Sequence, residues 1–589
     1  MKIRVFKATA SNNQVGTGKV SVGILAILLI LIAVSLSGCA QKKPEVETTP
    51  TAPVTPTPAT PITPTPAQPR LSLEKIEPAK EREKIPENYL PALLPWKLFK
   101  GGAESSMFYP SFIPRKPEVV FRVNVSSHFG FFVSTPLIEG DKIYLADDAG
   151  IYALDRKTGE FLWGKEILSD SLEGRKISYP QPWERWEALG IGKSVAAYGL
   201  GRYLYVATSG GGKNLVIAFD KATGNVVWKS ELEGEEDNLV TSNLLVADGK
   251  VCAGTVHSDA RVYCFTEDGK FLWSTKLEGN IRGLAYGDGT IFVTSEPTRK
   301  LFALDASSGE VKWVYQHDSG VNTAAYVEGR IIFTDSSGRV AALSKDGQLL
   351  WKKNVGAGSD VNTNSLLAAS RNGIYVARTL GEEPLELYVL DLDGNTIGSF
   401  TLLDGEYPGI PLVTEDIVVL PVKKNFEYSK IYLLWRGTAK LYELKVLESD
   451  EPWMPRVAVA YGEIYAVGRI PDVIYRLVDE EKPVIKEVRA ELLNASMRVK
   501  AVLQDERSAI YRAILVYSIN GSDWKYEEMQ PSRRYVTEPI GGYGLSEEPY
   551  EATIQLKPGS RIEFYVVAID NVGNYAMSEG YAYRVVYGQ

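Results

Sequence analysis

The sequence predicts an all-β protein: an eight-bladed β-propeller, with seven blades as the alternative count, followed by a β-sandwich. Three observations predict this fold. Glycine (52) and tyrosine (32) are plentiful, as expected for strands joined by tight turns. A short phrase that ends in tryptophan recurs about every 40 residues. After about residue 482 the phrase stops, and strands with a different spacing follow.

The composition argues against several classes of protein. A hydrophobic content of 44% is enough for a large core, so global disorder is excluded. The formal net charge is −8 and no segment carries a dense run of Lys and Arg, which argues against nucleic-acid binding. Three Cys and three His leave little material for metal or thiol chemistry. The scarcity of Gln, Met and Cys is typical of thermophilic proteins.

Residues 1–39 have the features of an export signal. Four basic residues lie in the first 19 positions, and an uncharged apolar run of 17 residues, Val20–Leu36, follows. That length is typical of a signal peptide and short for a membrane-spanning helix. The run ends in Leu36-Ser37-Gly38-Cys39, which resembles the lipobox of secreted lipoproteins and implies lipidation of Cys39. The alternative is an uncleaved membrane anchor, and both place the remaining chain outside the cytoplasm.

Residues 40–70 form a linker, and residues 71–116 a neck. Thr48–Pro69 contains eight Pro and eight Thr in 22 residues, which favours extended polyproline II structure spanning on the order of 70 Å. This spacer is either O-glycosylated on its threonines or undecorated. In the neck, we expect a helix in the charge-rich segment Leu73–Lys84 and packing of Tyr89–Phe112 on the main domain.

Residues 117–481 contain the repeat. In each strong copy a Gly lies four residues before the Trp, where it allows a tight turn between two strands. Four short strands per unit form one antiparallel sheet, which cannot bury both faces alone, so neighbouring sheets stack and close into a ring. A sixth, degraded copy spans Leu387–Phe400. The strong copies end at Trp163, Trp228, Trp273, Trp313 and Trp351.

The phrase Ala-x-Asp-x-x-Thr-Gly-x-x-x-Trp resembles the repeat of quinoprotein-type (pyrroloquinoline-quinone-like) β-propellers over about Glu118–Asp479. The resemblance implies that the five tryptophans dock between adjacent blades. A platform for a carbohydrate or cofactor is the alternative, but the constant spacing from turn to Trp favours packing. The last repeat lacks a fourth strand, and the orphan strand Val119–Val125 has the right character to complete it, closing the ring and removing a free edge.

The longest insertion separates the first two blades and contains Trp183 and Trp186. Aromatic residues on a loop at the rim of a propeller suit a binding surface, whereas the alternative is a loop folded as a lid over its own blade.

Residues 482–589 predict a β-sandwich. Phe564–Asn574 resembles the late strand and turn of fibronectin-III or immunoglobulin-like modules, which implies a spacer or adhesion unit. The loop Met529–Glu548 either recognises a partner or is a long hairpin loop. Sequons for N-glycosylation occur at Asn124, Asn494 and Asn520.

Little in the sequence indicates chemistry. Cys252 and Cys264 lie on two strands of one hairpin and are candidates for a disulfide, or alternatively small buried residues. Quinone-dependent enzymes of the resembled family use calcium, acidic and amide ligands, a stacking Trp and, in one branch, adjacent cysteines, which this chain lacks. The pattern Asp391-x-Asp393-Gly394-Asn395 coincides with a repeat turn rather than a calcium loop. We therefore assign no catalytic residue, metal or cofactor.

Two functional hypotheses follow. The first is a membrane-tethered, extracytoplasmic, non-catalytic binding or scaffold protein of the cell envelope, with a protein, peptide or glycan partner and no nucleic acid. The alternative is a dehydrogenase that depends on pyrroloquinoline quinone (PQQ) and calcium. The lipobox combined with an eight-fold repeat also resembles the lipoproteins of outer-membrane β-barrel assembly. The Thr/Pro-rich linker and the C-terminal sandwich depart from those lipoproteins, so that activity is not transferred.

Overall fold

The computed structural model describes residues 70–587 except 79–83, 99, 125–134, 148, 169–185, 211–212, 233–239, 241, 257–258, 357–365, 379–385, 404–405, 425–427, 437–440, 450–454, 469–472, 495 and 533–547. The predicted signal and lipobox Cys39, the Thr/Pro-rich linker, Trp183 and most of the loop Met529–Glu548 lie outside the described residues. Among the residues that are described, no helix has the length and apolar character needed to cross a membrane.

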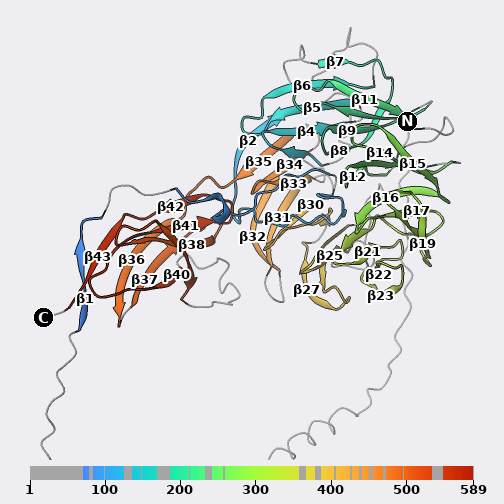
Figure 1. Ribbon diagram of the computed structural model, residues 1–589. Coiled ribbons are helices and arrows are strands. Elements are labelled where there is room, and N and C mark those ends of the chain that lie inside the picture. Colours follow the sequence, from blue (N-terminus) through green and yellow to red (C-terminus); the bar gives the residue numbers. More distant parts are fainter. Residues whose placement is uncertain are drawn as a thin grey trace, which may run out of the picture. The chain divides into compact units, whose positions relative to one another are not determined.

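Eight antiparallel sheets follow one another along the chain and form the blades of a propeller, as the sequence predicts (Figure 1). The first four blades are β3 (Leu137–Glu139), β4 (Lys142–Ala146), β5 (Gly150–Asp155) and β6 (Phe161–Glu166); β8 (Ser194–Leu200), β9 (Leu204–Ser209), β10 (Leu215–Phe219) and β11 (Val226–Glu231); β12 (Leu245–Ala247), β13 (Lys250–Gly254), β14 (Arg261–Thr266) and β15 (Phe271–Lys276); β16 (Asn280–Gly287), β17 (Thr290–Glu296), β18 (Lys300–Asp305) and β19 (Val311–Gln316).

The remaining blades are β20 (Ala325–Val327), β21 (Arg330–Thr334), β22 (Arg339–Ser344) and β23 (Leu349–Asn354); β24 (Leu367–Ser370), β25 (Gly373–Ala377), β26 (Glu386–Leu390) and β27 (Thr396–Thr401); β28 (Glu406–Pro408), β29 (Leu412–Val413), β30 (Ile417–Lys424), β31 (Tyr428–Arg436) and β32 (Leu441–Ser449); β33 (Arg456–Ala460), β34 (Glu463–Val467), β35 (Val473–Val478) and β2 (Glu118–Asn124). In blade 1 the outer strand β6 carries one further strand, β7 (Trp186–Ala188).

The turn before the outer strand shows why the repeat phrase folds as it does. In blade 1 the Asp155 carboxylate accepts hydrogen bonds from the backbone N–H groups of Lys157 and Thr158, at 2.9 and 2.8 Å. Gly159 then takes a positive φ of 73°, which a residue with a Cβ adopts only under strain. The Asp and Gly of the phrase therefore form the turn that precedes the outer strand, which carries the tryptophan.

The ring closes where β2, from the N-terminal side, pairs with β35 of blade 8. This N-terminal closure is the one the sequence predicts. Across the seam, Arg156 of blade 1 forms an ion pair with Glu463 of blade 8 at 2.8 Å. The Tyr461 hydroxyl accepts a hydrogen bond from the Gly140 N–H at 2.7 Å, so backbone and side chains both join the last blade to the first.

An N-terminal belt, residues 94–113, runs along the ends of the inner strands. Its backbone carbonyls accept hydrogen bonds from six blades in turn and pair in both directions with blade 1. The side chains of Trp96, Met107, Tyr109 and Ile113 are buried in the propeller core. The belt contacts are Leu94 O with Tyr461 N, Trp96 with Ile138, Lys97 O with Leu200 N, Ala103 O with Tyr286 N, Glu104 O with Tyr326 N, Ser106 O with Ala369 N, and Met107 O with Val413 N.

The C-terminal strands form one nine-stranded sheet in the order β1-β43-β41-β38-β39-β40-β37-β36, with β42 on β41. Apolar side chains from both halves of the sheet bury a common core, as expected for a sandwich. The strands are β36 (Val484–Leu493), β37 (Ser496–Gln504), β38 (Ile510–Ile519), β39 (Lys525–Pro531), β40 (Glu548–Gln555), β41 (Arg561–Asp570), β42 (Tyr575–Met577), β43 (Tyr581–Tyr587) and β1 (Leu71–Ile76).

The expectation of a helix in Leu73–Lys84 is wrong. Leu71–Ile76 is strand β1, which lies antiparallel beside β43, the last strand of the chain (Figure 1). Leu71 and Leu73 face the sandwich core at the two-residue period of a strand, while Ser72 and Glu74 are exposed. The only helical element in the described part of the neck is a single 3₁₀ turn, η1 (Glu87–Tyr89).

Candidate functional site

The five repeat tryptophans contact the turn glycines of the following blades. A Cβ added at Gly309 would lie 2.5 Å from the indole of Trp273, and the other pairs are equally tight. Each glycine has a positive φ, so its turn can approach the ring closely. The pairs are Trp163 with Gly224, Trp228 with Gly269, Trp273 with Gly309, Trp313 with Gly347, and Trp351 with Gly394.

Four of these indole N–H groups also donate to a carbonyl in the turn of the next blade. The acceptors are the carbonyls of Glu267, Ala306, Lys345 and Leu392, at 2.9–3.2 Å from the Nε1 atoms of Trp228, Trp273, Trp313 and Trp351. The Nε1 of Trp163 is buried without such a partner. The five tryptophans therefore pack one blade against the next, and the Nε1 atoms of Trp228, Trp273, Trp313 and Trp351 are committed to backbone carbonyls.

Cys252 and Cys264 are directly paired residues of β13 and β14, and their sulfurs form a disulfide. Both residues are buried within blade 3. The bond is therefore a cross-strand link inside one blade and is shielded from solvent.

One charged cluster lies between blades 4 and 5. His317 and Asp335 are buried, and the His317 Nε2 lies 2.9 Å from Asp335 Oδ2. Arg339 pairs with both Asp335 and Asp318, and Lys352 pairs with Asp318 at 2.8 Å. Hydrogen bonds from Lys352 and Arg339 hold the pKa of Asp318 well below its ordinary value. Because two cations already balance the two carboxylates, this cluster is built as an ion-pair network.

A second cluster brings three aspartates together beside the sandwich. Oxygen atoms of Asp479, Asp505 and Asp570 lie within 4.8 Å of one another. Burial, reinforced by the two other carboxylates, raises the pKa of Asp570 to about 7. Asp570 also accepts hydrogen bonds from the backbone of Val572 and from Asn574, and Asp479 accepts one from Ser508 at 2.5 Å. The cluster therefore joins the end of the propeller to the sandwich.

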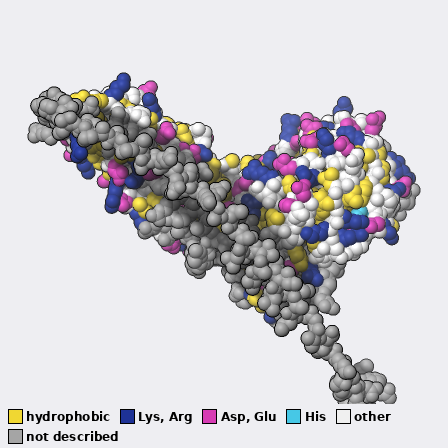
Figure 2. Space-filling view, turned by 90° about the horizontal axis from the view of Figure 1, so that it is seen from below, with side chains coloured by type: hydrophobic (Ala, Val, Ile, Leu, Met, Phe, Trp, Pro, Cys, Tyr) yellow, Lys and Arg dark blue, Asp and Glu magenta, His cyan; other side chains and the backbone are white. Residues whose placement is uncertain are grey.

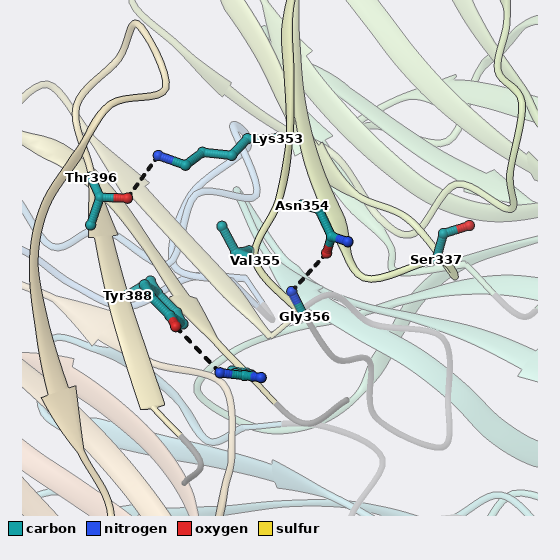
Figure 3. Close-up of a pocket in the computed structure, with 8 residues that line it drawn as sticks. Ser337, Lys353, Asn354, Val355, Gly356, Tyr388 and Thr396 are labelled. Carbon is teal, nitrogen blue, oxygen red and sulfur yellow. Dashed lines mark hydrogen bonds between the residues drawn. The ribbon is translucent and has the colours of Figure 1, made fainter. Parts of the chain in front are cut away.

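A cavity of about 440 Å³ opens between the outer parts of blades 5 and 6 (Figure 3). Lys353 and Asn354 reach it from the end of β23, and Arg378 and Tyr388 from blade 6. Lys353 Nζ donates to the Thr396 hydroxyl at 2.7 Å and to the Gly394 carbonyl at 3.1 Å. The Arg378 guanidinium donates to the Tyr388 hydroxyl at 3.4 Å. Among the described lining residues, two are cations and none is a carboxylate, while Glu386 lies beside the Tyr388 hydroxyl and raises its pKa. Lys353, which contacts only neutral oxygens there, is the group that suits an anion.

Two predicted sites are partly described. The backbone of Trp186 lies in β7, on the outer edge of blade 1, and its partner Trp183 lies outside the described residues. Asn494 and Asn520 are exposed and lie at turns with positive φ. Asn124 ends strand β2. N-glycosylation of these three residues stays a prediction.

Comparison with known proteins finds a match in the repeats. A family model described as "Outer membrane protein assembly factor BamB" matches residues 151–280 and 258–407. Proteins named Outer membrane protein assembly factor BamB from Yersinia pestis and Nitrosomonas eutropha are each 28% identical, over 157 and 113 residues. These alignments cover 24% and 19% of this chain, and the chain spans only 40% and 25% of the lengths of these curated relatives.

Solved structures with a similar fold include BamB from Moraxella catarrhalis and a europium-containing methanol dehydrogenase. The first is 12% identical, with a TM-score of 0.44, and the comparison covers 62% of this chain and 100% of that one. The second is 13% identical, with a TM-score of 0.47, and the comparison covers 66% and 98%.

The sequence predicted that Tyr89–Phe112 packs on the main domain, and Trp96, Met107 and Tyr109 are buried in the propeller core. Sequence reasoning did not predict the belt's hydrogen bonds to successive blades, the ion pairs at the seam or the basic cavity. Lys353 and Arg378 carry no motif, and they meet because neighbouring blades bring them together. One sequence signal was available: Lys353 occupies the same position after its tryptophan as Lys165 does in blade 1.

Proposed function

We propose that this protein is a membrane-tethered, extracytoplasmic scaffold of the cell envelope that binds other proteins and performs no catalysis. The observation that carries the proposal is the match of the repeat region to the family model of an outer-membrane protein assembly factor. The two curated relatives carry the same name, which favours a role among envelope proteins.

The geometry of the propeller supports a binding role. The five repeat tryptophans are engaged between blades, and the belt occupies the ends of the inner strands on one face. The surfaces left to a partner are therefore the rim, the outer strands and the opposite face. Figure 2 shows small groups of hydrophobic side chains between charges of both signs on the propeller surface, a mixture that suits protein partners better than nucleic acid.

The tether follows from the order of the chain. The proposed anchor is a lipid on Cys39 or a retained helix, and the Thr/Pro-rich segment is the proposed spacer. The chain then enters the folded part through β1, which is held along its length by β43. The Cys252–Cys264 disulfide is compatible with an oxidising, extracytoplasmic compartment.

The decisive experiment compares binding with catalysis in the full-length protein, purified in detergent. We expect photo-crosslinking in intact envelopes to capture specific envelope proteins. We expect no cofactor absorbance and no dye reduction with alcohols or sugars after incubation with PQQ and Ca²⁺. Turnover under those conditions would overturn the scaffold proposal in favour of a quinoprotein dehydrogenase. In cells, a Cys39→Ala variant is expected to lose labelling by radioactive palmitate.

A further inference from the structure

Blade 1 shows how its outer edge accepts an added strand. The extended segment β7 runs parallel to β6 and pairs with Gly164, Lys165 and Glu166. The carboxylate of Glu187 in β7 lies 2.5 Å from Lys165 Nζ, and the side chain of Lys165 is only 7% exposed. Backbone pairing and one acid–base pair together hold the added strand.

Blade 5 repeats the receiving half of this arrangement. Lys353 lies two residues after Trp351, as Lys165 lies two residues after Trp163, and the other strong copies have Ser230, Thr275 and Tyr315 at that position. Both lysines also reach the turn glycine of the next blade. Lys165 Cε lies close to Gly224, and Lys353 Nζ donates to the carbonyl of Gly394.

What blade 5 lacks, among the described residues, is the added strand. The three residues of β6 that pair with β7 are buried, whereas their equivalents Lys352–Asn354 are exposed or half-buried. Leu349 and Leu350 at the start of β23 are 45% and 48% exposed, much as Val226 and Val227 are in β11, so blade 5 differs from the other open outer strands in Lys353. An exposed apolar edge strand of this kind is a template for pairing with another chain.

The cavity lies where the acidic residue of an added strand would lie. In the part of the chain that the structure describes, Lys353 Nζ contacts only neutral oxygens, those of Gly394 and Thr396. Arg378 also lines the cavity. Tyr388 lines it with its aromatic ring (Figure 3). A carboxylate in this space would be held by charge-assisted hydrogen bonds.

We propose that the outer edge of blade 5 binds an extended, acidic segment of a partner protein as a strand parallel to β23. The partner backbone pairs with β23, apolar residues cover Leu349 and Leu350, and a carboxylate enters the cavity against Lys353. This inference rests on the proposed protein-binding function and names its site and the chemistry of its partner.

The test uses a fluorescein-labelled peptide of residues 185–191 of this chain, which contains β7, with fluorescence polarisation on the full-length protein. We expect saturable binding that Lys353→Met weakens about tenfold, the value of one charge-assisted hydrogen bond. The matched control is Lys352→Met, because its side chain pairs with Asp318 and does not line the cavity. It should leave affinity within about twofold. A peptide with Gln in place of Glu187 should bind with affinity reduced about as much as Lys353→Met reduces it. A peptide with an N-methylated backbone should not bind.

Three outcomes of the peptide assay would overturn the proposal. They are no saturable binding at about 1 mM peptide, equal binding by the N-methylated peptide, and binding that depends on Lys165 rather than Lys353, which would mean exchange with β7. Crosslinking in intact envelopes, compared between wild type and Lys353→Met, tests the blade 5 site separately from the proposed scaffold function. If Lys353→Met still captures the same partners, the scaffold function stands and the blade 5 site falls.

Discussion

At the residue scale, five of the blade boundaries depend on a close contact between one glycine and one indole. Each of these glycines needs a positive φ for its own turn and the absence of a Cβ for the neighbouring tryptophan. The two requirements meet at the same residue because turn and tryptophan are four positions apart within each repeat. The turn glycine of a blade therefore contacts the indole of the preceding blade. The indole of the same blade contacts the turn glycine of the following blade.

Gly309→Ala is expected to destabilise the propeller by about 2–4 kcal/mol, from the strained φ of 76° combined with overpacking. The new Cβ would lie 2.5 Å from the indole of Trp273. Urea unfolding followed by tryptophan fluorescence measures the loss.

Gly329→Ala is the matched control, since Gly329 has a φ of 73° and no atom within 4 Å of an added Cβ. It should cost only about 1 kcal/mol. Equal losses in the two variants would mean that the glycine–indole contact adds nothing to backbone strain.

At the element scale, closure of the ring is shared by a strand, a belt and a group of charges. β2 supplies the outer strand of blade 8, and the belt pairs with the inner strands of blades on both sides of the seam. Glu463 lies at this seam and pairs with Arg156 at 2.8 Å and with Arg476 at 2.7 Å. Burial alone would raise the pKa of Glu463, but the hydrogen bond from Arg476 and the charge of Arg156 outweigh it and lower the pKa.

Glu463→Gln is expected to cost about 3–5 kcal/mol at pH 7, because it leaves two partly buried guanidinium groups without their carboxylate. Since the pKa of Glu463 is lowered in the folded protein, its contribution is complete above the ordinary value of 4.5 and is lost as the pH falls through the lowered value. The difference in urea midpoint between wild type and variant should therefore be smaller at pH 3 than at pH 7.

The exposed Glu310, in a repeat turn, provides the comparison. Glu310→Gln should change stability by less than about 0.5 kcal/mol at either pH. A Glu463→Gln variant as stable as wild type at pH 7 would contradict the assigned role of the seam.

At the scale of the whole molecule, propeller and sandwich are joined by buried polar groups. Asp479 follows the last propeller strand, and its side chain and backbone accept hydrogen bonds from Ser508 and Asn574 of the sandwich. Asp570 lies beside it, and burial followed by the charges of Asp505 and Asp479 raises its pKa to about 7. The folded protein therefore favours the protonated form of Asp570.

Stability is expected to fall as the pH rises from 5 to 8, by on the order of 1–3 kcal/mol, because the folded protein holds a proton that the unfolded chain has already released. Asp570→Asn should remove this dependence and stabilise the protein at pH 8. Urea midpoints at both pH values, measured in EDTA, test it.

The exposed Asp523 in the same domain supplies the control, and Asp523→Asn should retain the wild-type dependence. If Asp570→Asn unfolds with the same pH dependence as wild type, Asp570 is not the residue responsible.

The sequence by itself predicted a closed ring, with eight blades favoured over seven, its closure by the strand Val119–Val125 and the sandwich that follows, and the structure has eight blades closed by Glu118–Asn124. These features are encoded locally: the Asp-to-Gly turn, the spacing from Gly to Trp and the alternation of strand residues recur in every strong copy. The structure also joins Cys252 and Cys264, which the sequence left open between a disulfide and buried packing, because cross-strand register depends on turn geometry.

Only the tertiary structure decided how the neck and the cavity are used. The sequence predicts a helix in Leu73–Lys84, but Leu71–Ile76 is a strand because the edge of β43 is available to it. The belt follows no period, since its contacts belong to the ends of strands in different blades. Lys353 and Arg378 line one cavity only because blades 5 and 6 pack side by side. Residues that come together from separate repeats have no fixed spacing in the sequence, so no sequence motif predicts such a site.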